Sequence, residues 1–187
     1  MPELPEVEIT RRGIEPHLAG KIITGVRVSE RRLRWPIPLK LAVRVTGRRI
    51  ARVARRGKYI LIDCSANGRA GWLILHLGMS GSLRIMDAGT VAQRHEHFDL
   101  LLGKRLLRLR DPRRFGAVLW QEGDIARHPL LADLGAEPLD DTFTGALLHA
   151  ATRTRKAAVK LILMNASIVV GVGNIYADES LFEDGIH

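Results

Sequence analysis

The sequence has 187 residues, 46% of them hydrophobic, which suits one large domain or one domain with part of a second and excludes wholesale disorder. No apolar run is long enough to span a membrane, the acidic start is unlike a secretory signal peptide, and the single cysteine, Cys64, excludes an intrachain disulfide and a multi-cysteine zinc site. The net charge of +9 points to a partner that is a polyanion.

The positive charge is concentrated in the first two thirds of the chain. Residues 1–120 hold 24 Lys and Arg against 10 Asp and Glu, whereas residues 121–187 hold 5 against 10. Most of the surplus is arginine, whose guanidinium can donate two hydrogen bonds to one phosphate, so we expect nucleic acid as the partner. A soluble basic protein without such a partner is the alternative. A membrane surface is disfavoured because the basic residues do not gather on one amphipathic helix.

The chain is predicted to begin with a helix from Pro5 to about Leu18. Proline is tolerated in a first helical turn, and Glu6 and Glu8 lie where the helix dipole favours negative charge. Short alternating or β-branched apolar runs, separated by glycine-rich turns, then predict strands at 21–29, 41–47, 58–64, 71–77, 82–86, 97–102, 104–110 and 116–121. About eight strands at this spacing indicate a β-sandwich or a barrel.

The last third of the chain is predicted to be helical. An acidic, proline-containing stretch near 123–142 is typical of a short helix and a connector. Three helices should follow: one capped by Thr142 or Thr144, one over 155–164, and one with Asn174 at its cap.

These elements together predict an α+β fold in two domains. We expect a β-sandwich or barrel domain over residues 1–135 and a helical domain over residues 136–187. The last predicted helix has no partner after it, so we expect the helical domain to be cut part-way. Neither internal repeats nor low-complexity tracts occur in the sequence.

The first residues carry groups that could do chemistry. Proline in second place normally permits removal of the initiator methionine, which would leave Pro2 with a secondary α-amine. Such an amine, with a pKa of about 7.7–8.0, is partly neutral at cellular pH and can attack a carbonyl-type carbon to form a Schiff base. Glu3 beside it, or Glu6 one helical turn further on, could act as a general acid or base. The alternative is an ordinary Pro- and Glu-rich helix start.

Three further motifs carry basic or exposed side chains. Lys58 lies between a glycine and an apolar strand, so it is a solvated strand-end charge, a desolvated amine or a phosphate ligand. Met79, in the tight turn "HLGMSGSL", is either a core filler or an exposed wedge. Arg113, Arg114 and Phe115 share a turn that suits insertion into nucleic acid, although Phe115 could equally anchor the next strand.

The segment "VVGVGNIYADES" places a glycine turn directly before a predicted helix. The free backbone amides and the dipole at a helix N-terminus can bind a phosphate. Glycine turns before helices are common, so this pattern by itself is a weak indication of a phosphate site.

Five stretches in the same order and at similar spacing resemble the bacterial formamidopyrimidine-DNA glycosylases: "MPELPEVE", "RRGKYILI", "HLGMSGSLR", "RDPRRFG" and "VVGVGNIYADESLF". The resemblance covers essentially the whole chain. It is closer than the likeness to endonuclease VIII, which shares the proline–glutamate start but differs in the wedge segments. It implies a base-excision repair enzyme that removes 8-oxoguanine and formamidopyrimidines and has abasic-site lyase activity. The implied fold is a β-sandwich flanked by helices, then a helix–two-turns–helix domain and a zinc finger.

The resemblance also implies catalytic roles. Pro2 is similar to the nucleophile that attacks the sugar C1′ and forms the Schiff base. Glu3 resembles the acid that assists base departure and sugar opening, and Lys58 the lysine linked to β-elimination. Glu6 would support the site by hydrogen bonding.

The implied DNA contacts fall in two groups. Met79, Arg113 and Phe115 match the family's wedge, which fills the gap left by a flipped nucleotide. The positions that match residues on or near the DNA backbone are His95, Arg113, Arg155, Lys160, Asn174 and Tyr176.

The sequence stops at His187, before the base-capping loop and the zinc finger of the family, so we expect no zinc or other cofactor in this chain. We expect a monomer in the bacterial cytoplasm, associated with the nucleoid. It would bind duplex DNA that contains oxidised purines or abasic sites, and it would not bind a membrane. By itself it would excise damaged bases weakly or not at all. One alternative is a non-catalytic remnant that binds damaged DNA. Another is a basic scaffold for RNA, which would not require the set of Pro2, Glu3 and Lys58.

Overall fold

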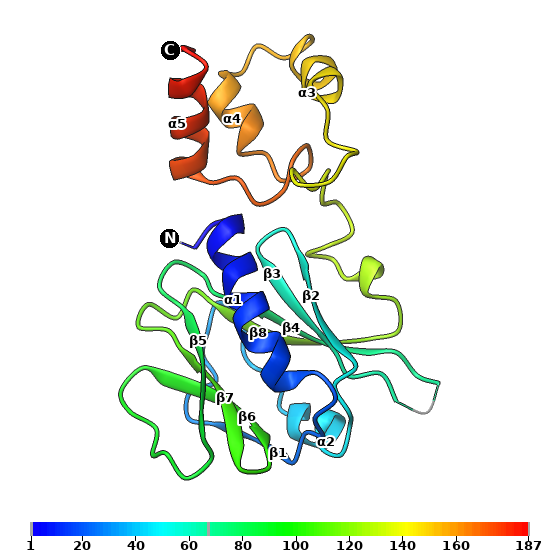
Figure 1. The fold of residues 1–187 in the computed structure, drawn as a ribbon, viewed down its shortest axis with the longest axis vertical. Helices are drawn as coiled ribbons and strands as arrows, with labels where there is room; N and C mark the ends of the chain where they lie inside the picture. Colours follow the sequence, from blue (N-terminus) through cyan, green and yellow to red (C-terminus); the bar gives the residue numbers. More distant parts are fainter. Residues whose placement is uncertain (1, 67, 187) are drawn as a thin grey trace.

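The protein is an α+β structure in two parts, as predicted. The computed structural model describes residues 2–66 and 68–186. In Figure 1 a β-sandwich forms the lower part, and helices α3 to α5 lie above it. The elements in chain order are α1 (Leu4–Leu18), β1 (Gly25–Val28), α2 (Leu41–Val45), β2 (Arg52–Arg56), β3 (Tyr59–Asp63), β4 (Gly71–His76), β5 (Ser82–Asp87), β6 (Glu96–Leu102), β7 (Arg105–Arg110), β8 (Ala117–Glu122), the 3-10 turn η1 (Ile125–Arg127), α3 (Gly145–Thr152), α4 (Val159–Leu163) and α5 (Asn174–Glu183).

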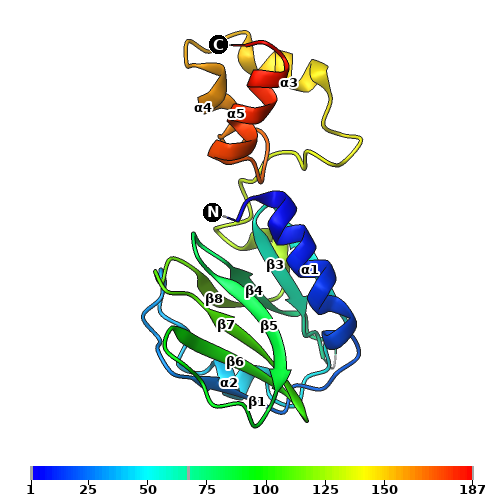
Figure 2. The same ribbon diagram turned by 60° about the vertical axis from the view of Figure 1, so that its left-hand side comes forward.

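The sandwich consists of two antiparallel four-stranded sheets. Their strand orders are β1-β6-β7-β5 and β2-β3-β4-β8. Apolar side chains from both sheets, from α1 and from α2 form the core between them. Helix α1 packs against β2, β3 and β5, and it therefore covers the side of the sandwich where the edge strands β2 and β5 lie (Figure 2).

Strands β3 and β4 are buried on both faces, which explains their nearly continuous apolar sequences. One face points into the main core. On the other face Leu61, Trp72 and Ile74 pack against Leu131, which belongs to the segment after η1. Strand β5, in contrast, has no fully buried residue and is covered on one side only.

The strand predicted at 41–47 is wrong, because this segment forms helix α2. Leu41 and Val45 are both buried, while Val43 between them is 84% exposed. A spacing of four residues between buried side chains is that of a helix face, although the β-branched composition favours a strand. The tertiary contacts of Leu41 and Val45 in the core thus override the local preference.

Strand β2 was not predicted from the sequence. Its residues, "RVARR", include three arginines and offer little apolar alternation. The strand forms because it pairs with β3 from Arg56↔Tyr59 onward, across a two-residue turn made of Gly57 and Lys58. Gly57 has a φ of +54°, a left-handed conformation that glycine adopts readily.

The helical predictions are confirmed in part. Helix α1 has the predicted extent, and the Thr144 hydroxyl caps α3 by accepting a hydrogen bond of 3.2 Å from the Leu147 amide. The helix predicted over 155–164 is shorter, because Ala158 has an extended backbone (ψ 140°) and α4 begins only after it. Asn174 is the first helical residue of α5, so Gly173 occupies the cap position predicted for it. Within the described residues, no helix is long and apolar enough to cross a membrane.

The sandwich contains a buried ion cluster around Arg108. The Arg108 guanidinium donates to both Asp99 oxygens, at 2.7 and 2.8 Å, and to Glu96 at 2.9 Å. Asp99→Ala would leave this charge without its bidentate partner, and we expect the free energy of unfolding in denaturant to fall by about 3–5 kcal/mol.

The exposed pair of Arg32 and Glu30 provides the control for this prediction, since Arg32→Ala should leave the denaturation midpoint nearly unchanged. An Asp99→Ala midpoint equal to that of Arg32→Ala would show that the buried ion cluster does not stabilise the sandwich.

Candidate active site

The buried Glu3 carboxylate lies at the N-terminus of α5, although the two are far apart in the sequence. Its Oε2 accepts hydrogen bonds from the amides of Gly173 at 2.6 Å and Tyr176 at 3.4 Å, and its Oε1 accepts one from Ile175 at 3.0 Å. These amides and the helix dipole compensate the negative charge of a fully buried group. Glu3 therefore occupies three of the backbone amides at the helix N-terminus that the sequence pattern weakly indicated as a phosphate site.

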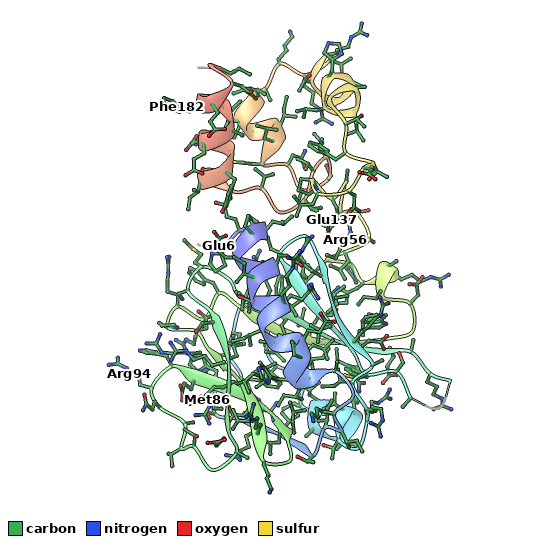
Figure 3. All side chains as sticks on the ribbon, viewed as in Figure 1. Glu6, Arg56, Met86, Arg94, Glu137 and Phe182 are labelled. Atoms are coloured by element: carbon green, nitrogen blue, oxygen red, sulfur yellow. The ribbon has the colours of Figure 1, made fainter. Side chains whose placement is uncertain are left out.

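Glu6 and Tyr176 extend this arrangement. The Glu3 amide donates to Glu6 Oε2 at 2.9 Å, and the Tyr176 hydroxyl donates to Glu6 Oε1 at 3.1 Å. Partial burial acts to raise the pKa of Glu6, but these hydrogen bonds outweigh it and the pKa is lowered. The bond to Glu6 raises the pKa of Tyr176. In Figure 3 Glu6 lies at the end of α1 that faces the helices.

Lys58 reaches the same place from the β2–β3 turn. Its Nζ donates to the Val172 carbonyl at 3.2 Å, and the Leu4 amide donates to the neighbouring Gly171 carbonyl at 3.0 Å. Burial lowers the pKa of the half-buried Lys58 amine, although the carboxylates of Glu3 and Glu6 act in the opposite direction. An amine with a lowered pKa is neutral, and so nucleophilic or basic, in a larger fraction of molecules.

The structure thus brings three of the predicted catalytic residues to the junction of α1, α5 and the β2–β3 turn. Glu3, Glu6 and Lys58 all contact residues of the 171–176 segment. Pro2 directly precedes Glu3 and is partly exposed. The predicted DNA-contacting residues Asn174 and Tyr176 lie in the first turn of α5 at this junction.

The predicted wedge residues form a second cluster on two adjacent loops. A side chain at Gly78 would collide with the backbone of Phe115, so the two loops are in direct contact. Met79 and Phe115 are 40% and 44% exposed, and the Arg113 guanidinium lies 4.9 Å from the centre of the Phe115 ring. A cavity of about 460 Å³ lies here, lined by Arg34, His76, Gly78, Met79 and Phe115.

Asp111 holds the wedge loops together, a role that the sequence reading missed. This fully buried carboxylate accepts hydrogen bonds from the Ser80 hydroxyl at 2.8 Å and from the Gly116 amide at 2.7 Å. Its backbone is hydrogen-bonded to His95 and to Arg114, which have φ values of 72° and 58°. An aspartate directly before a proline in a turn was the signal that could have indicated it.

The sequence and fold have counterparts in known proteins. Residues 1–118 match the formamidopyrimidine-DNA glycosylase N-terminal domain, and residues 134–187 match the formamidopyrimidine-DNA glycosylase H2TH domain. This chain belongs to the formamidopyrimidine-DNA glycosylase family.

Individual relatives agree with this assignment. The chain is 54% identical over 191 residues to the formamidopyrimidine-DNA glycosylase of Burkholderia cenocepacia (strain HI2424), with all of this chain and 68% of the relative covered. It is 56% identical over 188 residues to that of Methylococcus capsulatus, with the same coverage. The solved complex of Lactococcus lactis Fpg with abasic-site DNA superimposes with a TM-score of 0.89 at 30% identity, over 99% of this chain and 68% of that one. A complex of a variant of the Lactococcus lactis protein with Fapy-dG DNA gives 0.90, over 100% and 68%.

The other DNA-contacting residues predicted from the family resemblance lie away from the catalytic junction. His95 is partly exposed, and its carbonyl accepts a hydrogen bond from the Asp111 amide at the base of the wedge; desolvation, together with the surrounding positive charges, lowers its pKa. Lys160 forms an ion pair with Asp178 of α5 at 2.7 Å. The exposed Arg155 donates to the Ala151 carbonyl at 3.1 Å. Lys160 and Arg155 lie in the helical part, and their contacts with DNA stay predictions.

Residues 2–66 and 68–186 contain no group of three or more His, Cys, Asp or Glu side chains that could hold a metal ion.

Gly173→Ala tests the contact between Glu3 and α5. The added methyl group would collide with the Glu3 carboxyl, while the backbone at this position (φ −127°) is acceptable to alanine. We expect the displaced carboxylate to lose amide hydrogen bonds and the free energy of unfolding to fall by about 1–3 kcal/mol.

Gly13→Ala is the matched control, because nothing lies within 4 Å of the added methyl group and the position is inside α1. This change should stabilise the protein slightly, by about 0.5–1 kcal/mol. Equal unfolding curves for the two variants would contradict a tightly held Glu3.

A pH dependence should arise from His76. Burial, with the nearby positive charges of Arg34 and Lys58, lowers the pKa of His76 to about 4, and its Nδ1 accepts a hydrogen bond of 3.0 Å from the Gly78 amide. Because the unfolded histidine has the higher pKa, the unfolded state binds a proton first as the pH falls. We expect stability to decrease from about pH 6.5 downward.

Denaturant unfolding at several pH values would measure this effect. His76→Gln should show a flatter profile between about pH 6.5 and 5, above the range in which Asp and Glu titrate. If the wild type and His76→Gln lose stability in parallel over this range, His76 is not the group responsible.

Proposed function

We propose that this chain is a DNA glycosylase with abasic-site lyase activity that acts on oxidised purines, such as 8-oxoguanine and formamidopyrimidines, in duplex DNA. The observation that carries the proposal is the junction where the Pro2–Glu3 start, Lys58 and the 171–176 segment meet. This arrangement supports the proposal because an amine-based lyase needs a nucleophilic amine, a proton-transfer group and a second amine or base within one site.

In the proposed reaction the free secondary amine of Pro2 attacks the sugar C1′. The bond from C1′ to the damaged base breaks, and the base leaves with the electron pair and takes up a proton from water. Glu3, whose side chain is bound by the amides of α5, accepts the amine proton and passes it to the ring oxygen as the sugar opens. The product is an iminium ion between Pro2 and C1′.

The iminium ion makes the C2′ proton acidic. Loss of this proton and departure of the 3′ phosphate give β-elimination, after which water hydrolyses the iminium and releases Pro2. Lys58 is the residue proposed to assist this stage. Its lowered pKa increases the fraction of neutral amine that can take a proton. Glu6 orients Glu3 through the bond to the Glu3 amide.

The wedge residues Met79, Arg113 and Phe115 are proposed to enter the space left by the damaged nucleotide. Their partial exposure on two adjacent loops supports this role. The similar Lactococcus lactis structures are complexes with DNA that contains an abasic site or Fapy-dG, and we propose the same class of partner for this chain. We also propose that it acts as a monomer with domains at 1–135 and 136–187.

Borohydride trapping on duplex DNA with one abasic site tests the proposal. An abasic site needs no base recognition, so the assay isolates the amine chemistry. We expect a covalent adduct, seen as a band of combined mass on a denaturing gel, because reduction of the iminium makes the bond to Pro2 permanent.

The control is the same chain with a short N-terminal extension, which turns the Pro2 nitrogen into an amide and should abolish the adduct. An adduct of equal yield from the extended chain would assign the nucleophile to another amine. Salt-sensitive binding with no adduct from the unextended chain would favour a non-catalytic DNA-binding protein.

A further inference from the structure

Glu137 connects the sandwich to the helical part through the turn that carries Lys58. Its Oε1 accepts a hydrogen bond from the Gly57 amide at 2.7 Å and one from Arg56 at 3.0 Å, and its Oε2 accepts one from Arg55 at 2.6 Å. Gly57 is adjacent to Lys58 in the two-residue turn. Figure 3 shows Glu137 and Arg56 side by side at the junction of the two parts.

The backbone next to Glu137 is bound to the segment that receives Lys58. Ala136 forms a parallel bridge with Val169, and the Val170 amide donates to the Ala136 carbonyl at 2.9 Å. The chain then continues directly through Gly171 to Val172, whose carbonyl accepts the hydrogen bond from Lys58 Nζ. One short stretch of chain therefore holds both the turn that carries Lys58 and the loop that Lys58 contacts.

We propose that Glu137 is a positioning residue for Lys58: its carboxylate holds the β2–β3 turn against the 171–173 loop and so keeps the Lys58 amine beside Glu3. Only the role of Lys58 in the reaction rests on the function proposed above. The position of Lys58 follows from the contacts of Glu137 with Gly57 and of Lys58 with Val172. The Glu137 side chain is only 11% exposed, and it keeps its charge because its hydrogen bonds outweigh the effect of burial and lower its pKa.

The test measures where Lys58 lies, independently of activity. Reductive methylation with ¹³C-formaldehyde keeps the lysine charge, and NMR titration then gives the pKa of each lysine, with Lys58→Arg to assign the signal. In Glu137→Ala the turn should loosen and Lys58 should become hydrated. We expect its pKa to rise toward the ordinary value of 10.5.

The sign of the change separates positioning from simple electrostatics. Removal of the Glu137 negative charge with no movement would lower the pKa of Lys58. The titratable groups that face Lys58 are the carboxylates of Glu3 and Glu6 and the neutral His76. Glu137→Gln loses the charge but keeps an oxygen for the Gly57 amide, so Lys58 should stay in place and its pKa should not rise. An unchanged or lowered pKa in Glu137→Ala would overturn the proposal.

Glu8→Ala is the matched control for loss of stability. Glu8 also binds Arg55, at 3.0 Å, but it does not contact Gly57. The pKa of Lys58 should therefore stay within about 0.3 units of its wild-type value. An equal rise in Glu8→Ala would mean that any weakening of the ion-pair network frees Lys58. If Glu137→Ala does not fold, Glu137→Asp replaces it, because the shorter side chain cannot reach the Gly57 amide and both arginines.

The second readout is the rate of borohydride trapping at saturating abasic-site DNA. Glu137→Ala should slow it about tenfold or more with little change in DNA affinity, and Glu137→Gln should restore most of the rate. Equal rates for wild type and Glu137→Ala would overturn a role in positioning for the reaction. If the wild type itself forms no adduct, the proposed function fails, while the titration of Lys58 still decides the role of Glu137.

Discussion

The bond between the Glu3 carboxylate and the N-terminus of α5 is the interaction on which the rest of this structure depends. A fully buried carboxylate needs compensating donors, and the amides of Gly173 and Ile175 supply them. The consequence is that the third residue of the chain is held inside the protein at the base of a C-terminal helix. Glu3 is thereby held against the same 171–176 segment that Lys58 contacts.

A second set of contacts at the same junction joins strand β2 and the β2–β3 turn to Glu137. Arg55 and Arg56 of the sandwich bind Glu137 of the helical part, and Glu137 also accepts the Gly57 amide. The candidate chemistry therefore lies where the two parts meet, and both contribute to it. The wedge loops are held separately by Asp111 within the sandwich, so the catalytic junction and the wedge are two structural units on one protein.

Much of the fold could be predicted because local patterns and tertiary contacts agree in most segments. The apolar runs of β3 and β4 and the acidic first turn of α1 indicate the correct elements. The prediction fails where the two conflict. Residues 41–47 have the composition of a strand but bury Leu41 and Val45 on one helical face. Strand β2 has three arginines among its five residues and forms by pairing with β3.

The sequence by itself determined the family, the sandwich strands with clear apolar patterns and the identities of Pro2, Glu3 and Lys58 as candidate catalytic groups, because these are carried by motifs within a few residues. Only the tertiary structure decided what those groups contact. The glycine turn before α5 has the local form of a phosphate site, yet its amides bind Glu3, and nothing near Glu137 in the sequence indicates that it meets Gly57. Contacts between residues 80 or 170 positions apart depend on how the whole chain packs, and a local pattern does not contain that information.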